Sequence, residues 1–224
     1  MSRKTFLSLS LFLVILAPLV AATEEENTDK GNSFSFSGNT TTITLQEGER
    51  KTVLSGDARI TFDETSIKAD EITLSGPDFR YIECTGAVLM EDTEKGITLK
   101  TKKLLHDRTL RQTRGSGYTE IVDAENELSA RCYYFEQEEE TETMVLQVGV
   151  RIDTVSAGKA VVCQSELARY NRGEKSLELI GSPSVEWKGD EYQADRILIN
   201  MGNDTIVMEG SVSGSLTEEE EKAE

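Results

Sequence analysis

The stretch Gly56–Gly86, GDARITFDETSIKADEITLSGPDFRYIECTG, is the unit from which most of the chain is built. A glycine opens a run of alternating apolar residues, and glycines recur at positions 56, 86, 117, 149, 181 and 210, in steps of 30, 31, 32, 32 and 29 residues. Apolar alternation with a period of two predicts strands that bury one face. Self-similarity at a near-fixed period predicts a repeat architecture. The sequence therefore predicts an all-β array of about five repeats of roughly 31 residues.

A second pattern recurs inside each repeat: an apolar residue, a small residue two positions later, and another apolar residue three positions after that. In a strand, positions i and i+2 share one face, whereas i+5 belongs to the other. The pattern therefore predicts a bulge or corner that turns the strand in every unit. It is found at Ile67/Ala69/Ile72, Leu99/Thr101/Leu104, Leu128/Ala130/Tyr133, Val162/Gln164/Leu167 and Tyr192/Ala194/Ile197.

The first 22 residues differ in composition from the rest. A basic start at Arg3 and Lys4 precedes the apolar run 6–16, and small residues at Val20 and Ala22 suit a signal peptidase. We expect an exported protein, cleaved after Ala22. The alternative is a retained membrane anchor, although the apolar run is shorter than the roughly 20 residues of a span. Residues 23–32 are predicted to be a flexible segment, 33–216 a single β domain, and 217–224 an acidic disordered tail.

The net charge excludes several classes of partner. The chain carries −17, and removing residues 1–22 with their two cations gives −19. Phosphate binding needs a basic footprint, so a nucleic-acid partner is not expected. Docking on anionic lipid head groups is disfavoured for the same reason. The acidic runs Glu136–Glu142 and Glu218–Glu224 are interpreted as a solvated loop and a solvated tail.

Catalytic and metal-binding motifs are missing from the sequence. His106 is the single histidine, which excludes a histidine metal cluster, and its place near a strand end is typical of an ordinary surface residue. Asp70 and Asp195 recur at one repeat position, which indicates a structural role rather than an acid–base pair. No nucleotide-binding loop, nucleophile elbow or calcium loop is present. We therefore expect neither enzymatic activity, nor a cofactor, nor a metal.

Three cysteines, Cys84, Cys132 and Cys163, leave at least one thiol unpaired. Cys132 and Cys163 fall at similar offsets in neighbouring repeats, so a disulfide between them is one possibility. The favoured interpretation is three small buried apolar residues.

An open stack of repeats leaves one unpaired strand at each end. The predicted edge strands lie near 40–45 and 206–212. Exposed strand edges form backbone hydrogen bonds with other chains, so we expect head-to-tail association. The residues predicted for these edges are Thr40, Thr42 and Thr44 at one end and Ile206, Met208 and Gly210 at the other.

The units LSGDARITFDETSIKADEITL, VGVRIDTVSAGKAVVCQSELARY and LIGSPSVEWKGDEYQADRILINMGNDTIVMEG resemble the OstA-like repeat. That repeat has a glycine, an alternating strand, and then apolar-x-Ala-Asp-x-Ile. It builds the periplasmic proteins of the lipopolysaccharide-transport LptA family, including the periplasmic part of LptC and the amino-terminal domain of LptD. The resemblance covers about residues 33–216.

The resemblance implies an open β-jellyroll of about sixteen antiparallel strands whose apolar trough holds lipid A acyl chains. It further implies a periplasmic carrier of lipopolysaccharide or lipooligosaccharide that joins head to tail and bridges inner-membrane LptC-like and outer-membrane LptD-like domains. On that basis, the residues expected to line the trough are Ile43, Ile60, Phe62, Ile72, Leu74, Leu104, Tyr133, Phe135, Leu167, Tyr170, Ile197 and Ile199.

Two alternatives stay open at this point. A retained anchor at residues 1–22 would make the chain an LptC-like partner. A fully packed core would make it a structural or adhesive β-solenoid that binds no lipid. Periodicity does not separate a closed core from an open trough.

Overall fold

A computed structural model describes residues 34–46, 49–156 and 158–217 of the chain. These residues belong to one compact unit, Asn32–Glu224. The predicted signal peptide, the segment 23–32 and the acidic run Glu218–Glu224 lie outside the described residues.

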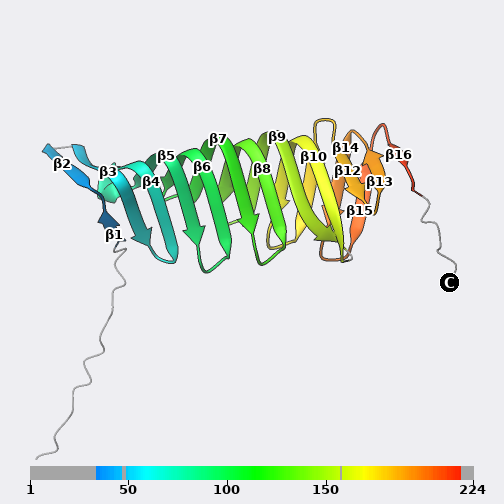
Figure 1. The fold of residues 1–224 in the computed structure, drawn as a ribbon, viewed down its shortest axis with the longest axis horizontal. Helices are drawn as coiled ribbons and strands as arrows, with labels where there is room; N and C mark the ends of the chain where they lie inside the picture. The colour runs from blue at the N-terminus through cyan, green and yellow to red at the C-terminus, as the bar shows by residue number, and fades with distance from the viewer. Residues whose placement is uncertain (1–33, 47–48, 157, 218–224) are drawn as a thin grey trace, which may run out of the picture. The chain divides into compact units, whose positions relative to one another are not determined.

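The described chain is almost entirely strand, as predicted (Figure 1). One short 3-10 helix, η1 (Pro77–Phe79), interrupts it, and no helix in the described part is long and apolar enough to span a membrane. All strand pairs are antiparallel, and the described strands form one open sheet. The sixteen strands are β1 (Phe34–Ser37), β2 (Thr40–Gln46), β3 (Glu49–Phe62), β4 (Thr65–Ser75), β5 (Tyr81–Asp92), β6 (Ile97–Asp107), β7 (Gln112–Asp123), β8 (Leu128–Glu138), β9 (Thr143–Ser156), β10 (Lys159–Asn171), β11 (Ser176–Ile180), β12 (Ser184–Trp187), β13 (Asp190–Gln193), β14 (Arg196–Asn200), β15 (Thr205–Glu209) and β16 (Ser213–Ser215).

The sheet is folded along its middle into two facing halves. Each long strand from β3 to β10 changes register partway along and contributes one part to each half. The split strands at the two ends, such as β1 and β2, supply one half each. Half-sheet I contains residues 40–46, 49–55, 71–85, 103–116, 134–147, 167–180 and 196–209. Half-sheet II contains residues 34–37, 58–68, 88–101, 119–132, 150–156, 158–165, 184–193 and 213–215.

The recurring glycines form the bend, which confirms the predicted bulge. Between the pairs Thr85↔Lys103 and Val88↔Thr101, β5 has one residue more than β6, and Gly86 lies in that bulge with φ 101°. Positive φ is rare for residues with a Cβ, which explains the choice of glycine. The glycines at 56, 117, 149, 181 and 210 also have positive φ.

In β8 the inward-facing side chains switch from even-numbered to odd-numbered positions, and this change comes two residues later than the motif predicted. Cys132 and Phe135 are the buried residues on either side of the change, rather than Ala130 and Tyr133. Tyr133 faces the bulge of β7, because Ser116 pairs with Tyr134 and Thr119 pairs with Cys132. The residue opposite the glycine bulge turns outward, so Tyr133 is 54% exposed.

In β10 the change comes one residue later than predicted. Ser165 and Ala168 are the buried residues on either side of it, whereas Gln164 is exposed and Leu167 half-buried. The motif misplaced both changes because Cys132 and Ser165 are themselves small residues that fit the interior just before the bend. In the units that contain Ala69 and Thr101, the motif placed the change correctly.

The inner faces of both half-sheets pack into one apolar core. On half-sheet I a single register row runs through Leu54, Ile72, Cys84, Leu104, Gly115, Phe135, Leu146, Ala168, Leu179 and Ile197. Gly115 leaves room for the ring of Phe135, which is fully buried. The three cysteines are buried and unpaired, as favoured from the sequence, and burial raises the pKa of the Cys84 thiol to about 12.

Candidate functional site

The site with the most concentrated chemistry is the seam, which we define as the line where the outer margins of the two half-sheets meet opposite the bend. The turns at 76–80, 108–111, 139–142, 172–175 and 201–204 form rim I, and those at 63–64, 93–96 and 124–127 form rim II. Backbone hydrogen bonds join successive turns along one rim, such as Glu139 N–H to Arg111 O at 3.1 Å. Among the described residues, no backbone–backbone hydrogen bond joins rim I to rim II. In this part of the chain, every hydrogen bond or ion pair across the seam therefore involves at least one side chain.

The turns that form the rims share a local sequence signal. A strand ends in Asp or Asn, and that side chain accepts hydrogen bonds from backbone N–H groups two or three residues later. Asp92 accepts from Lys95 at 2.9 Å, Asp123 from Asn126 at 3.2 Å, and Asn171 from Glu174 at 2.8 Å. Asp and Asn favour such turns because their short side chains reach the following backbone. These aspartates are thereby held at the mouth of the interior.

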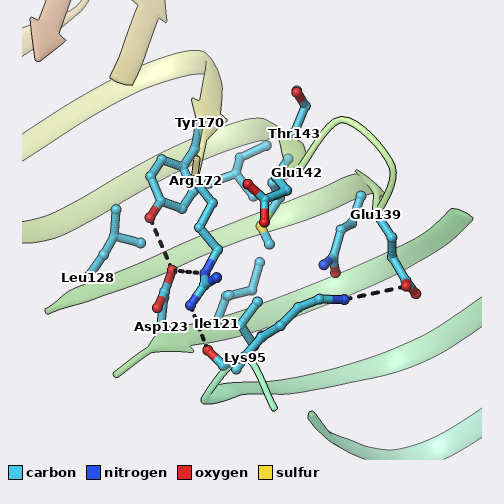
Figure 2. Close-up of a pocket in the computed structure, with 13 residues that line it drawn as sticks. Lys95, Ile121, Asp123, Leu128, Glu139, Glu142, Thr143, Tyr170 and Arg172 are labelled. Atoms are coloured by element: carbon cyan, nitrogen blue, oxygen red, sulfur yellow. Dashed lines mark hydrogen bonds and ion pairs between the residues drawn. The ribbon is translucent and has the colours of Figure 1, made fainter. Parts of the chain in front are cut away.

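Arg172 makes the densest contact across the seam (Figure 2). From rim I, its Nε donates to Asp123 Oδ2 at 3.0 Å and its Nη2 donates to the carbonyl oxygen of Lys95 at 2.8 Å. Nη2 also pairs with Glu125. Asp123 is only 2% exposed and accepts a further hydrogen bond from the hydroxyl of Tyr170 at 3.0 Å. A buried carboxylate is costly unless it is paired, so Arg172 and Tyr170 stabilise Asp123 in place.

Burial, reinforced by the neighbouring Asp123 carboxylate, raises the pKa of Tyr170 above its usual range. The tyrosine therefore stays neutral and acts as a donor across the seam. It projects from half-sheet I, whereas Asp123 ends a strand of half-sheet II.

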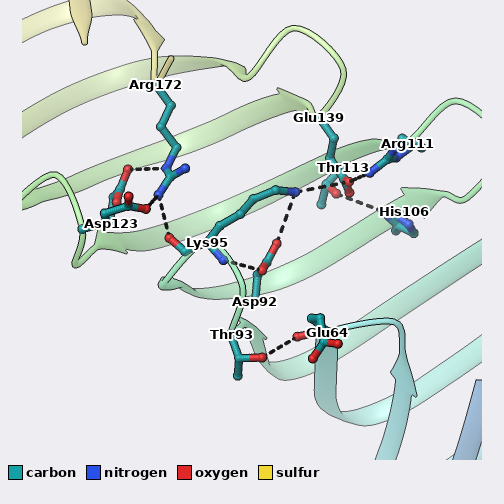
Figure 3. A network of polar contacts seen from close by, with 11 residues as sticks. Glu64, Asp92, Thr93, Lys95, His106, Arg111, Thr113, Asp123, Glu139 and Arg172 are labelled. Carbon is teal, nitrogen blue, oxygen red and sulfur yellow. Dashed lines mark hydrogen bonds and ion pairs between the residues drawn. The ribbon is translucent and has the colours of Figure 1, made fainter. Parts of the chain in front are cut away.

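Lys95 forms the second bridge across the seam (Figure 3). Its Nζ lies 3.4 Å from Glu139 Oε2 on rim I and 3.3 Å from Asp92 Oδ2 on its own rim. Glu139 also pairs with Arg111 at 3.1 Å, and its side chain is only 15% exposed. The sequence suggested that the whole run Glu136–Glu142 is solvated. Glu139 is an exception, because its side chain turns into the seam.

Further contacts join the halves at other points. Toward the amino-terminal end, His106 stacks on Phe62 with ring centroids 5.2 Å apart. Toward the carboxyl-terminal end, the Ser156 hydroxyl donates to Asp204 Oδ1 at 2.9 Å. The seam is bridged along its length by side chains of several chemical kinds.

His106 is not the surface residue that the sequence suggested. It is 3% exposed, and its Nδ1 lies 3.0 Å from the hydroxyl of Thr113. Burial lowers the pKa of His106, so the ring is held neutral. His106 pairs in register with the inward-facing Ile82 and Thr113, which places it inside.

Two adjoining cavities lie at the seam and share Lys95 and Glu139. One is an apolar cavity of about 20 Å³ beneath Arg172 and Lys95. Aliphatic side chains from both half-sheets line it, namely Ile97, Ile121, Leu128, Met144 and Leu146. The other is a polar cavity of about 250 Å³, lined by Asp63, Glu64, Asp92, Glu94, Glu139, Lys95, Arg108, Arg111 and His106 among others. An apolar site beside a polar one suits an amphipathic ligand, but the apolar cavity is far smaller than an acyl chain.

The structure places most of the predicted lining residues on the inner face. Those buried there are Ile60, Phe62, Ile72, Leu74, Leu104, Phe135, Tyr170, Ile197 and Ile199. Tyr133 lies on the outer face, which corrects its assignment, and Leu167 is half-buried beside the bend. Ile43 pairs with the inward-facing Thr52, yet it is 53% exposed because no further strand of the described chain covers that end. Whether these side chains contact lipid stays a prediction.

The structure places the predicted edge residues in, or next to, strands at the two ends of the sheet. Thr40, Thr42 and Thr44 are in β2, which pairs with β3 alone. Ile206 and Met208 are in β15, which pairs with β14 alone, and Gly210 follows directly. Head-to-tail association through these strands stays a prediction.

The residues that sequence reasoning missed are the polar residues of the seam, above all Lys95, Asp123, Glu139 and Arg172. The recurring Asp or Asn at strand ends was a usable signal for the rims. No local signal pairs Asp123 with Arg172, which are 49 residues apart. The described residues bring together no group of three His, Cys, Asp or Glu side chains that could hold a metal ion.

No protein-family model matches the sequence, and no curated protein matches it at a significant level. Among solved structures, the chain is similar to the crystal structure of LptH, the LptA-homologous periplasmic component of the conserved lipopolysaccharide transport device from Pseudomonas aeruginosa. The two share 8% sequence identity with a TM-score of 0.29, and the match covers 85% of this chain and 99% of LptH. This likeness concerns the fold alone.

Proposed function

We propose that this chain is a carrier of lipopolysaccharide or a related glycolipid, which holds acyl chains between the two half-sheets and admits them through the seam. One observation carries the proposal. The bend is continuous backbone, whereas among the described residues every hydrogen bond or ion pair across the seam involves at least one side chain. The half-sheets can therefore separate along the seam without breaking a sheet hydrogen bond.

The energies favour such an opening when a lipid is present. Exposed ion pairs contribute at most about 1 kcal/mol each, although the buried Asp123–Arg172 pair is worth more. Each buried methylene contributes about 0.8 kcal/mol, so an acyl chain of about twelve carbons offers roughly 10 kcal/mol. An entering chain would also keep the separated inner faces out of water.

The polar cavity bears on where the head group lies. Five carboxylates line it against three cations, and the chain as a whole carries −17. Phosphate groups would be repelled there. We infer that a phosphorylated head group stays in water outside the seam, or that the lipid is poor in phosphate. Lipid affinity that falls as salt concentration rises would contradict this repulsion.

The location and partners follow from the OstA-like resemblance. We propose a periplasmic protein whose end strands β2 and β15 join other jellyroll domains, either copies of itself or LptC-like and LptD-like partners. At the amino-terminal end, Phe36 and Ile43 support this because both are large apolar side chains left exposed at an edge. Exposed strand edges offer unpaired backbone groups to another chain, and apolar side chains gathered beside them favour such an interaction.

A structural array without lipid is the second candidate, and the small apolar cavity favours it. A photo-crosslinking residue placed singly at Ile121 or Leu146, which line that cavity, separates the two in cells. Tyr133 and Arg59 serve as outward controls. Glycolipid adducts at the inner positions alone would support the carrier. Their absence in protein that still folds would leave the structural array.

A further inference from the structure

The outer face of half-sheet II carries a row of cations that the net charge conceals. The cross-strand partners run Arg59↔Lys68, Lys68↔Leu89, Leu89↔Lys100, Lys100↔Glu120, Glu120↔Arg131 and Arg131↔Arg151. Neighbouring strands lie about 4.8 Å apart, so seven consecutive strands present one residue each to the same line. This line holds five cations and one carboxylate, in a chain of net charge −17.

Several of these cations are not neutralised locally. Lys68 pairs loosely with Glu91 at 3.9 Å, and Arg151 pairs with Asp153 at 2.9 Å. The side chains of Arg59, Lys100 and Arg131 make no hydrogen bond or ion pair within the described residues, although Glu120 is the cross-strand neighbour of both Lys100 and Arg131. Their charge is available to a partner.

The row adjoins a depression of about 620 Å³ at the bend, which we call the lysine groove. Lys100, Lys102 and Lys103 line it together with one carboxylate, Glu120, and the remaining lining residues are Thr85, Gly86, Ala87, Thr101 and Tyr118. The hollow lies beside the bulge at Gly86, where the Asp70 carboxylate covers the glycine. The rings of Tyr118 and Tyr133 pack edge to face with their centroids 5.9 Å apart, and both side chains are about half exposed. Exposed tyrosines beside arginine are typical of protein-binding surfaces, and the lysines add the positive charge that an acidic partner requires.

We propose that the lysine groove and its adjoining row bind an acidic segment of a second protein chain. Charge complementarity selects the partner. An extended polyanion such as a membrane surface is repelled by the net negative charge of the whole protein. A short acidic segment is attracted by the local cations, because charges farther away than the Debye length of about 8 Å are largely screened. Tyr118 and Tyr133 provide apolar contact area for the partner's backbone and aliphatic stems. This surface lies at the bend, away from the seam, and does not depend on lipid binding.

The test uses the full chain and a labelled peptide with the sequence of residues 215–224, SLTEEEEKAE, as an acidic probe. Fluorescence anisotropy should show saturable binding that weakens with added salt, and the peptide with Gln in place of every Glu should not bind. The triple variant K100Q/K102Q/K103Q should raise Kd by about tenfold or more. The matched control K51Q/K159Q/K175Q removes three exposed lysines elsewhere and should leave Kd unchanged.

Three results would overturn the proposal. These are no saturable binding of the acidic peptide, an equal loss of affinity in both triple variants, and binding of anionic vesicles through the same lysines without binding of the peptide. Lipid crosslinking at the seam is independent of each, so failure here leaves the carrier proposal untouched.

Discussion

Asp70 accepts a hydrogen bond from the backbone N–H of Ala87 at 3.2 Å, with its carboxylate lying directly over Gly86. The same relationship recurs near the other end of the array, where Asp195 accepts from the N–H of Ser211 at 3.0 Å beside Gly210. The Ala-Asp of the repeat is therefore structural: its carboxylate satisfies a backbone donor that the bulge leaves without a strand partner.

Gly86→Ala should destabilise the fold by about 2–3 kcal/mol, because the new Cβ would overlap the Asp70 carboxylate and occupy φ 101°. Gly96→Ala is the matched control. Gly96 has φ 64° but no atom closer than 3.9 Å to an added Cβ, so it should cost only about 1 kcal/mol. Urea unfolding measures both, and equal losses would mean that the Asp70 contact does not restrict this position.

The Asp123–Arg172 pair should show strong coupling in a double-mutant cycle. Arg172→Met leaves Asp123 buried without its cation and should cost about 3–5 kcal/mol of unfolding free energy. Asp123→Leu in the same chain removes the unpaired buried carboxylate and should recover a large part of that loss. If the losses of unfolding free energy in the two single variants simply add in the double variant, Asp123 is solvated in the folded protein and the seam is looser than described.

The glycine bends and the alternation of the strands could be predicted from sequence because both are local. The seam could not, since it depends on how far the two half-sheets close, which brings Arg172 to Asp123 from distant repeats. His106 shows the same limit. Polar neighbours suggested a surface residue, but its register opposite the inward-facing Ile82 and Thr113 places it inside.

Stability should fall as the pH drops below the ordinary histidine range. Burial lowers the pKa of His106, so below about pH 6.5 the unfolded chain binds a proton that the folded chain does not. This loss is absent above that pH and grows as the pH falls toward the lowered pKa. His106 is the only histidine, so His106→Phe should flatten the unfolding free energy between about pH 7.5 and about pH 5. An unchanged pH slope in this variant would show that other groups titrate there.

Loosening the seam should speed lipid entry if the seam is the entrance, a prediction that rests on the proposed function. Glu139→Gln weakens the bridge to Lys95 and the pair with Arg111 while keeping the shape of the side chain. It should raise the uptake rate of a fluorescent acylated lipid by about threefold, in proportion to a loss of roughly 0.6 kcal/mol across the seam.

Glu136→Gln is the matched control for this change, because Glu136 pairs with Arg114 at 3.3 Å within half-sheet I and does not bridge the seam. Peroxide oxidation of Met144, a buried side chain that lines the apolar cavity beneath the seam, reports seam opening without lipid and should accelerate in Glu139→Gln alone. Faster oxidation without faster uptake would mean that the seam opens but is not the route of entry. Equal behaviour of the two variants would mean that Lys95 and Glu139 do not hold the seam closed.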